Sequence, residues 1–590
     1  MILQALQGYY NRLADDPQSG VARPGYSEQK ITFIVGLNPD GTLHEIKDGR
    51  REEVTILRNG KQKVDLRPTP MIVPGGAKPP GAGLNPGFLW DNTGYLLGFK
   101  PEDPNPERTR ESFEAFRARH LEIEGAINDA AFSTVCRFLE GWNPDQATGH
   151  PVLAELTSGF GIFQISGEQE YVHNRAAIRV WWDAQRESAE SGEVGFCLVT
   201  GQALPIATLH EPAIKGVVGA QSSGAKLVSF NCDAFESYGK EQGANAPVSE
   251  AAAFAYCNAL NLLLGRDRQR LQMGDSTTVF WTDQPTPLPG EAPADELVSF
   301  LLDSAQQEPQ DAGLKNRIKV VLEKAAQGQL AADDLGDAAT PFYILGLSPN
   351  ASRLSVRFWH QSTLGEISER LLRHIQRLSL VRQWDESAKN PDPLIPSVWQ
   401  LLRQTGREAK DIPPFLGGAL MEAILSGGKY PDALVSAILR RIKADRDVNY
   451  LRACALKAWL IRNQEQTIQP MLDETNTQPG YLLGRLFAAL EKTQQDALGD
   501  VNSGIRDRFY ASASSTPRAV MSRLMKTFNF HVAKLEGGFR TNREKLVQDI
   551  LDPLRDFPAH LTLEQQSLFA LGYYHQRKAF FTKKDDTSKD

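Results

Sequence analysis

The sequence changes character near residue 397. Before that point, short apolar runs such as Ile31–Val35 and Phe342–Leu347 are bounded by turn signals, which is typical of short strands and hairpins. Beyond Val398, apolar residues recur at helical spacing. We therefore predict an α+β N-terminal region of short sheets, hairpins and helices, followed by an all-α C-terminal helical bundle.

At 590 residues, the chain is longer than one hydrophobic core usually supports. We predict an α+β N-terminal domain over residues 1–270, an α+β middle module over 271–384 and a C-terminal helical domain over 397–590. The polar segment Asp385–Pro396 contains three prolines and is the predicted linker between the last two.

Turn signals predict several connections. The turn Asn38–Gly41 predicts a hairpin between Ile31–Val35 and Leu43–Ile46, and Asn59-Gly60 predicts a second hairpin turn. Ser348-Pro349-Asn350 predicts the turn between two further strands. Arg67–Gly87 is rich in proline and glycine, so we expect a long exposed loop there. We expect helices over residues 2–14, over residues 107–140 and from Ser249 to about Gly265.

The composition argues against membrane, metal and redox classes. No apolar run reaches the roughly 18 residues that a membrane helix needs. The N-terminus lacks the pattern of a signal peptide, so we expect a cytoplasmic protein with no membrane partner. The five cysteines are widely spaced without a Cys-x-x-Cys pair, so we expect no metal site and no cofactor.

The segment Gly195–Leu264 is crowded with small polar residues yet interrupted by short apolar pieces. This mixture predicts an ordered system of surface loops. Gly216, Gly219 and Gly224 are followed by Ala225-Lys226, which departs from the spacing of a phosphate-binding P-loop. What remains is a loop whose amides can cradle anionic oxygens, with Lys215 and Lys226 at its ends.

A second polar loop covers residues 238–247. Gln242 and Asn245 can read base edges, and Lys240 can contact a phosphate. The alternative is a tight turn whose amides satisfy the local backbone. The sequence leaves both interpretations open.

Two basic stretches are candidates for contact with a nucleic-acid backbone, although the net charge of the whole chain is −7. From Ala351 to Arg382 the net charge is +4, with Arg353 and Arg357 on a predicted strand and the arginines of the next helix on one face: Arg370, Arg373 and Arg377. Glu366 and Glu369 precede Arg370 and Arg373 by four residues, so part of this charge can be paired within the helix. The alternative to contact with nucleic acid is that these arginines form a solvated face.

Residues 504–548 carry a net charge of +6, on predicted helices that also bear Phe528, Phe530 and Phe539. This composition suits sequence-independent contact with a nucleic-acid strand. The basic candidates in this stretch are Arg518, Arg523, Lys526, Lys534, Arg540, Arg543 and Lys545.

Separated segments of the chain resemble one family, the large subunit of the type I-C CRISPR surveillance complex (Cascade). The central part of the resemblance, at Ile214–Val217, Gly224–Asn231 and Asn245–Val248, is the most specific. The other segments are Met1–Leu6 with Tyr9-Tyr10, Tyr95–Phe99, Leu198–Gly201, Leu345–Asn350 and Val356–Trp359.

The resemblance implies a non-catalytic subunit of an RNA-guided complex in antiviral defence. Such a subunit recognises a protospacer-adjacent motif (PAM) in double-stranded DNA, helps to open the duplex, stabilises the R-loop and offers a docking surface to a helicase-nuclease. Its partners are the guide-RNA-bound backbone subunits and the subunit that caps the 5′ end of the guide. The resemblance does not assign this role to individual residues. From the two polar loops we expect the PAM and duplex contacts to come from Lys215, Gln221, Ser222, Ser223, Lys226, Lys240, Gln242 and Asn245, and Lys78 in the proline- and glycine-rich segment is a further candidate for the minor groove.

In the same family, a small helical subunit is often made from an internal start codon. Met471 is the start that we predict here, which would yield a small-subunit-like polypeptide over residues 471–590; Met421 is the poorer choice, because it lies inside a helix-like run. Two other functions stay open. One is an enzyme that processes a nucleotide or nucleic acid through the glycine-rich loop at 216–226, and the other is a purely structural scaffold.

Overall fold

The computed structural model describes most of residues 1–582. The residues outside this description are 17–18, 57–61, 77–82, 157–158, 190–192, 267–268, 274–275, 284–297, 300, 303–319, 322, 326, 330, 332–333, 335–336, 386, 500–501 and 583–590. The predicted turn Asn59-Gly60 and most of residues 284–336 therefore lie outside it.

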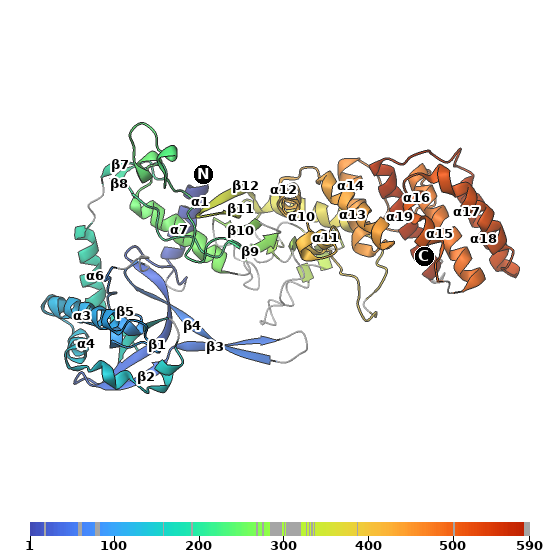
Figure 1. Cartoon of the computed structure of the whole chain (residues 1–590). Helices are drawn as coiled ribbons and strands as arrows, with labels where there is room; N and C mark the ends of the chain where they lie inside the picture. Colours follow the sequence, from blue (N-terminus) through green and yellow to red (C-terminus); the bar gives the residue numbers. More distant parts are fainter. Residues whose placement is uncertain are drawn as a thin grey trace. The chain divides into compact units, whose positions relative to one another are not determined.

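The chain divides into two compact units, which Figure 1 labels by element. The first unit comprises Met1–Ile214 and Val228–Leu262, and the second comprises Lys215–Leu227 and Leu263–Asp590. The segment Lys215–Leu227, which contains the predicted glycine-rich loop, thus belongs to the second unit, although the sequence on both sides of it belongs to the first. The boundaries of the three predicted domains stay a prediction.

The first unit is built on a six-stranded sheet with the order β3-β4-β1-β6-β5, and β2 pairs with the other end of β1. β1 pairs antiparallel with β2 and β4 but parallel with β6. The predicted hairpin around residues 31–46 is confirmed. The strands of this unit are β1 (Tyr26–Leu37), β2 (Leu43–Asp48), β3 (Arg50–Ile56), β4 (Gln62–Pro74), β5 (Trp90–Asp91), β6 (Phe160–Ile165), β7 (Val194–Phe196) and β8 (Ala203–Pro205).

The prediction of a loop over Arg67–Gly87 is wrong in its first part, because β4 extends to Pro74. β3 pairs with β4 only as far as Pro68, and β1 then pairs with it from Thr69 to Pro74. One side of β4 therefore has no strand neighbour near Pro70 and Pro74, and proline is tolerated where no N–H is required. Composition alone could not show that these prolines lie at such positions.

The expected helix over residues 107–140 is divided in two. α3 (Pro106–Ile123) ends before a short 3-10 turn, and a second helix, α4 (Ala130–Gly141), begins directly after Asp129. The Oδ1 atom of Asp129 accepts hydrogen bonds from the amides of Ala131 and Phe132, at 2.9 and 3.1 Å. Asp129 is thus an N-cap inside the predicted helix.

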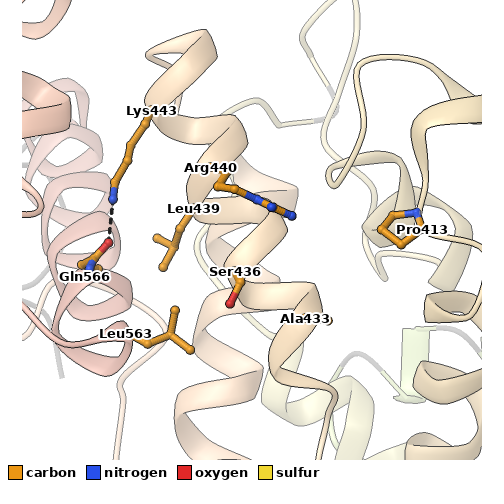
Figure 2. Close-up of a pocket in the computed structure, with 8 residues that line it drawn as sticks. All are labelled: Pro413, Ala433, Ser436, Leu439, Arg440, Lys443, Leu563 and Gln566. Atoms are coloured by element: carbon orange, nitrogen blue, oxygen red, sulfur yellow. Dashed lines mark hydrogen bonds between the residues drawn. The ribbon is translucent and has the colours of Figure 1, made fainter.

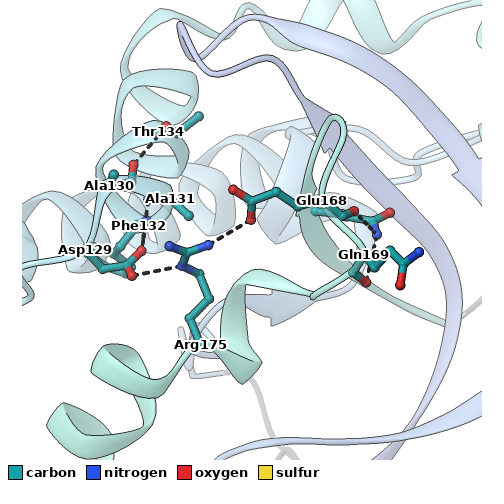
Figure 3. A network of polar contacts seen from close by, with 9 residues as sticks. Asp129, Ala130, Ala131, Phe132, Thr134, Glu168, Gln169 and Arg175 are labelled. Carbon is teal, nitrogen blue, oxygen red and sulfur yellow. Dashed lines mark hydrogen bonds and ion pairs between the residues drawn. The ribbon is translucent and has the colours of Figure 1, made fainter.

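The same carboxylate joins α4 to the end of the sheet, as Figure 3 shows. The Oδ2 atom of Asp129 lies 2.9 Å from Nε of Arg175, and Nη1 of Arg175 lies 2.8 Å from Oε2 of Glu168. Arg175 thereby clamps the start of α4 to the turn that follows β6. The helices of this unit are α1 (Ile2–Ala14), α2 (Thr93–Leu97), α3, α4, α5 (Pro151–Ala154), α6 (Ala176–Ala189) and most of α7 (Glu250–Gly265).

The second unit begins with a four-stranded antiparallel sheet of order β12-β11-β10-β9. The predicted strand pair is confirmed, but its turn is misplaced. Ser348, Pro349 and Asn350 are the last residues of β11, and Asn350 pairs directly with Arg353. The turn is Ala351-Ser352, with Ala351 in the left-handed region at φ 53°. The strands are β9 (Arg270–Met273), β10 (Ser276–Thr282), β11 (Pro341–Asn350) and β12 (Arg353–Thr363).

Beyond residue 363 the described part of the second unit is helical, so the predicted division into an α+β region and a helical region is confirmed. No helix among the described residues is long and apolar enough to cross a membrane. The helices are α10 (Leu364–Leu378), α11 (Val398–Arg403), α12 (Leu416–Ser426), α13 (Asp432–Asp445), α14 (Tyr450–Asn463), α15 (Pro479–Leu498), α16 (Ile505–Ala513), α17 (Pro517–Val532), α18 (Gly537–Leu551) and α19 (Leu563–Phe581).

α15 and α19 pack at very close range because glycines lie between them. A Cβ atom on Gly484 would lie 2.0 Å from the carbonyl oxygen of Phe569, and one on Gly572 would lie 2.2 Å from that of Tyr481. No side chain can occupy these positions unless the two helices move apart. This contact is the centre of the helical region after Met471.

Candidate nucleic-acid interface

The glycine loop, residues 214–227, has a backbone that only glycine adopts easily. Gly216, Gly219 and Gly224 have φ values of 93°, 83° and 104°. A residue with a Cβ atom is strained in this left-handed region. The loop also lies close to its surroundings, since a Cβ on Gly219 would lie 3.2 Å from Cγ of Pro349. The glycines are thus required by conformation and by packing.

The loop is anchored to the sheet of the second unit at two points. The amide of Val218 donates to Oγ1 of Thr277, at 3.2 Å. At the other end, the amide of Lys226 donates to the carbonyl of Ser352 at 3.0 Å, and the carbonyl of Lys226 accepts from Leu354 at 2.9 Å. Lys226 therefore forms a parallel bridge with Arg353 and adds to the edge strand β12.

Between these anchors the loop presents polar side chains. A hydrogen bond of 2.9 Å from the amide of Gly224 to the carbonyl of Gln221 closes a turn. The side chains of Lys215, Gln221, Ser222 and Ser223 are exposed, whereas Lys226 is half-buried. Residues 214–227 include two lysines and no acidic residue. Such a loop can attract a phosphate through its charge and can offer hydroxyl and amide groups to base edges.

The second predicted loop, residues 238–247, belongs to the first unit. The side chain of its Asn245 forms hydrogen bonds with the backbone of the same loop region. Oδ1 of Asn245 accepts from the amide of Ser237 at 2.9 Å. Nδ2 of Asn245 donates to the carbonyls of Lys240 and Gln242, at 2.8 and 3.1 Å. This arrangement matches the alternative in which the amide satisfies the local backbone. Lys240 and Gln242 are both exposed.

The predicted basic face of β12 is interrupted by a β-bulge. Gly346 pairs with Phe358 while Leu347 pairs with Val356, so Arg357 is an extra residue in β12. Strict alternation is therefore wrong at this point, and Val356 is 43% exposed beside the exposed Arg357. Bulges redirect side chains in this way. Arg357 lies over the ring of Phe415, at 5.5 Å from its centroid.

The arginines of α10 all have protein partners. Arg370 pairs with Glu366 and Arg373 with Glu369, as the spacing predicted. Arg370 also donates to the carbonyl of Leu425 at 2.8 Å, which joins α10 to α12. Burial lowers the pKa of Arg377, whose side chain is partly enclosed near Tyr430. Arg373, which is 57% exposed, remains the most accessible of the three.

In the part of the chain that the structure describes, the C-terminal basic stretch separates into cations with a carboxylate partner and cations without one, and of the latter Arg523 lies over the ring of Phe509, at 5.5 Å from its centroid. Arg518 pairs with Asp556, Arg540 with Glu544 and Arg543 with Asp496. Among the described residues, no carboxylate lies within 4.0 Å of the four other candidates, which are all exposed: Arg523, Lys526, Lys534 and Lys545.

Arg523, Lys526 and Phe530 recur at i, i+3 and i+7 on α17, and therefore share one face of the helix. Phe530 is 75% exposed, and Phe539, at the start of α18, is 78% exposed. Phe528, by contrast, is buried in the core. We call Arg523, Lys526, Phe530, Lys534 and Phe539 the basic-aromatic face. Cations for phosphates and aromatic rings for unpaired bases are what single-stranded nucleic acid requires.

Lys78 lies outside the described residues. Of the predicted site residues, the structure brings together Lys226 and Arg353, and separately the α17 cations. The helical spacing of Arg523, Lys526 and Phe530 could have identified their shared face from sequence. The proximity of Lys226 and Arg353 had no signal in the sequence.

The buried histidines do not resemble catalytic groups. Burial lowers the pKa of His120 and of His374 to about 3 and that of His575 to about 4. His374 contacts the hydroxyl of Tyr430 at 2.5 Å, and His575 that of Tyr481 at 2.8 Å. Across the described part of the chain, no group of three or more His, Cys, Asp or Glu side chains is placed to hold a metal ion.

A pocket of about 340 Å³ lies between α13 and the start of α19 (Figure 2). Nζ of Lys443 donates to Oε1 of Gln566 across it, at 2.7 Å. Leu439, Leu563 and Pro413 supply apolar walls. None of the predicted site residues lines this pocket, which marks the packing of α19 against α13.

A protein-family model described as CRISPR-associated protein (Cas_Csd1) matches residues 6–581, nearly the whole chain. The match includes the glycine loop, β12 and the basic-aromatic face. No curated protein matches the sequence.

Proposed function

We propose that this chain, which belongs to the Csd1 family of CRISPR-associated proteins and is a Cascade subunit, recognises a PAM in double-stranded DNA without catalysing a reaction. The membership agrees with the resemblance to the type I-C large subunit. The finer assignment of PAM recognition is supported mainly by the bridge that places Lys226 beside Arg353.

The glycine loop has the properties that duplex recognition requires. Its two ends are held by the sheet, so the exposed Gln221, Ser222 and Ser223 are presented with little conformational freedom. Lys215, Lys226 and Arg353 supply positive charge for the DNA backbone. Backbone contacts position the protein, and the polar side chains at the tip sample the bases. Lys240 and Gln242 remain proposed contacts from the other loop, whereas the amide of Asn245 bonds to the backbone of that loop.

We assign the basic-aromatic face to the displaced DNA strand. Opening of a duplex leaves one strand unpaired, and its bases can stack on exposed aromatic rings while its phosphates contact lysine and arginine. Stabilisation of the R-loop in this way, followed by docking of a helicase-nuclease, completes the proposed role. Guide-RNA pairing supplies the remaining sequence specificity.

The position of Met471 supports an internal start for a small helical partner. Met471 is 63% exposed in the segment that precedes α15, so translation from it would yield α15 to α19 intact. A start at Met421, which is fully buried within α12, would divide that helix. Replacing Met471 with Ala should abolish a companion polypeptide of about 120 residues, the span from Met471 to Asp590. Persistence of that polypeptide would place the start elsewhere.

PAM reading is tested by changing Gln221, Ser222 and Ser223 together to Ala in the complex assembled with guide RNA. These side chains are exposed, so assembly should be unaffected. We expect the preference for a PAM-containing duplex over a duplex with a scrambled PAM to fall by roughly tenfold or more, since each base contact contributes about 1–3 kcal/mol. Unchanged discrimination would remove this loop from the PAM site.

Two other outcomes would favour the alternative functions. If no substitution in either the glycine loop or the basic-aromatic face alters DNA affinity or its salt dependence, a purely structural scaffold is the better description. Metal-dependent turnover of a nucleotide or nucleic acid by the isolated chain, lost on substitution of residues 216–226, would favour an enzyme.

A further inference from the structure

Exposed apolar side chains gather on the part of the first unit that includes the second predicted loop, residues 238–247. They come from two segments, residues 193–211 and 231–250. Tyr238 is 99% exposed. The other five are between 38% and 65% exposed: Val194, Phe196, Leu198, Leu209 and Phe235. We call this set, together with the carboxylates of the two segments, the apolar-acidic surface.

The two segments lie directly against each other. The amide of Leu198 donates to the carbonyl of Pro247 at 2.9 Å, and that of Ala207 donates to Val248 at 2.9 Å. The amide of Gly243 donates to the carbonyl of Thr208 at 3.1 Å. The exposed side chains therefore belong to one region of the surface.

Tyr238 is held outward by a strained turn. Tyr238 and Gly239 both have positive φ, at 55° and 68°, and the amide of Lys240 donates to the carbonyl of Ser237 at 3.1 Å. This is the geometry of a type I′ turn, in which glycine, asparagine and aspartate normally occupy the two central positions. Backbone strain from a tyrosine at the first central position destabilises the loop by about 1–3 kcal/mol. Asn245 holds the strained turn in place from inside the loop.

Apart from the single lysine proposed above to contact DNA, the charge of this region is unfavourable for contact with phosphates. The two segments contain six carboxylates and one lysine, Lys240, a net charge of −5. An acidic surface repels a nucleic-acid backbone. Exposed aromatic and aliphatic side chains are typical instead of the centre of a protein–protein interface, where they become buried.

We propose that the apolar-acidic surface docks a neighbouring protein subunit of the complex, through a face that is apolar at its centre and bordered by lysine and arginine. Charge complementarity determines this choice of partner, since a subunit that binds guide RNA carries basic side chains. Tyr238 is the central anchor, because it is the most exposed ring of the surface and its backbone is already held by the turn, which reduces the entropy lost on binding. The inference rests on membership of the complex and not on the proposed PAM contacts.

The experiment uses the full chain, co-expressed with the other subunits and guide RNA. One variant carries Phe196→Ser and Tyr238→Ser, and a second carries Asp233→Lys and Glu241→Lys. We avoid Glu236, since its carboxylate accepts a hydrogen bond from the amide of Gln242 at 2.9 Å. The matched controls are Val180→Ser, at a side chain that is 69% exposed on α6, and Glu107→Lys, at an exposed position on α3.

We expect both surface variants to lower the affinity of the chain for the remaining complex by roughly tenfold or more, as loss of an interface anchor does, while the controls assemble normally. Mass photometry measures the incorporated fraction, and thermal unfolding of the isolated chain confirms that the variants fold. Normal incorporation of both surface variants would overturn the proposal. Normal incorporation with loss of duplex binding would assign the surface to DNA and would overturn it as well. If changing Gln221, Ser222 and Ser223 leaves PAM discrimination unchanged, the proposed PAM contacts are wrong but this test of the apolar-acidic surface is unaffected.

Discussion

Lys226 and Arg353 form a parallel β-bridge, although 126 residues separate them in the sequence. The bridge is made by two backbone hydrogen bonds, from Lys226 to Ser352 and from Leu354 to Lys226, at 3.0 and 2.9 Å. It adds the end of the glycine loop to the edge strand β12 of the second unit's sheet. Two cations that the sequence assigns to different candidate sites are thereby placed at one edge.

We predict that Lys226→Gln combined with Arg353→Gln weakens binding of the assembled complex to duplex DNA. The affinity should fall for PAM-containing and scrambled duplexes alike, since these side chains are proposed to contact phosphates. The slope of log affinity against log salt should become less steep by about 0.9 for each lost phosphate contact. Fluorescence polarisation over a salt series measures both effects.

The matched control is Lys410→Gln, at a lysine that is 77% exposed outside the proposed interface. It should change neither the affinity nor the salt slope. An unchanged slope in the double variant would contradict the assignment of Lys226 and Arg353 to the DNA backbone.

Phe530→Ala should weaken binding of single-stranded DNA by at least about 1 kcal/mol, roughly fivefold, because one stacked base loses its platform. The ring is 75% exposed, so the stability of the chain should not change. Titration of a labelled oligonucleotide measures the affinity. Trp384→Ala, at an aromatic side chain that is 53% exposed outside the basic-aromatic face, is the control and should have no effect.

Gly484→Ala should destabilise the chain by about 1–3 kcal/mol, since its Cβ would collide with the backbone of α19. Gly538→Ala provides a control of opposite sign. A Cβ on Gly538, in the first turn of α18, meets nothing within 4 Å, so alanine should stabilise by up to about 1 kcal/mol. Denaturant unfolding measures both changes. Equal effects of the two substitutions would contradict the close contact of α15 and α19.

Acidification should destabilise the fold through the buried histidines. The pKa of His120 and of His374 is about 3 in the folded chain, well below the ordinary value of 6.5, because burial disfavours the charged ring. The unfolded state therefore binds protons more readily, and stability is lost as the pH falls below about 6.5. The loss is on the order of 2 kcal/mol for each such histidine between pH 7.5 and 5.0.

Urea unfolding at the two pH values measures this dependence. Replacing His374 with Gln removes one titrating group, so the difference between the two pH values should shrink by the contribution of that group. A variant whose pH dependence equals that of the original chain would show that His374 is not buried as a neutral ring.

Asn245→Ala should loosen the loop around Tyr238 without unfolding the unit. The substitution removes three hydrogen bonds, to Ser237, Lys240 and Gln242. Hydrogen exchange at the amide of Ser237 should become faster, since its acceptor is lost. Asn245→Asp keeps that acceptor and should protect this amide more than alanine does. Equal exchange in both variants would contradict the role of Asn245 as the internal support of the loop.

The local elements were largely determined by the sequence. The helix α1, the hairpin of β1 and β2, the helix α7 and the helical region after Val398 could all be predicted, because periodicity and turn chemistry are local properties. The pairing of Glu366 with Arg370 and of Glu369 with Arg373 followed from helical spacing alone.

What only the tertiary structure decided are the features that depend on distant neighbours. The prolines of β4 fit a strand because β3 begins at Arg50, opposite Pro68, and so does not pair with the residues beyond it. The bulge at Arg357 arises from the register of β12 against β11. Asn245 is turned inward by the backbone groups of its own loop, and Lys226 reaches Arg353 only because the glycine loop joins a sheet formed by later residues. A sequence states which groups are available, whereas the free energy of packing and of long-range hydrogen bonding determines which of them meet.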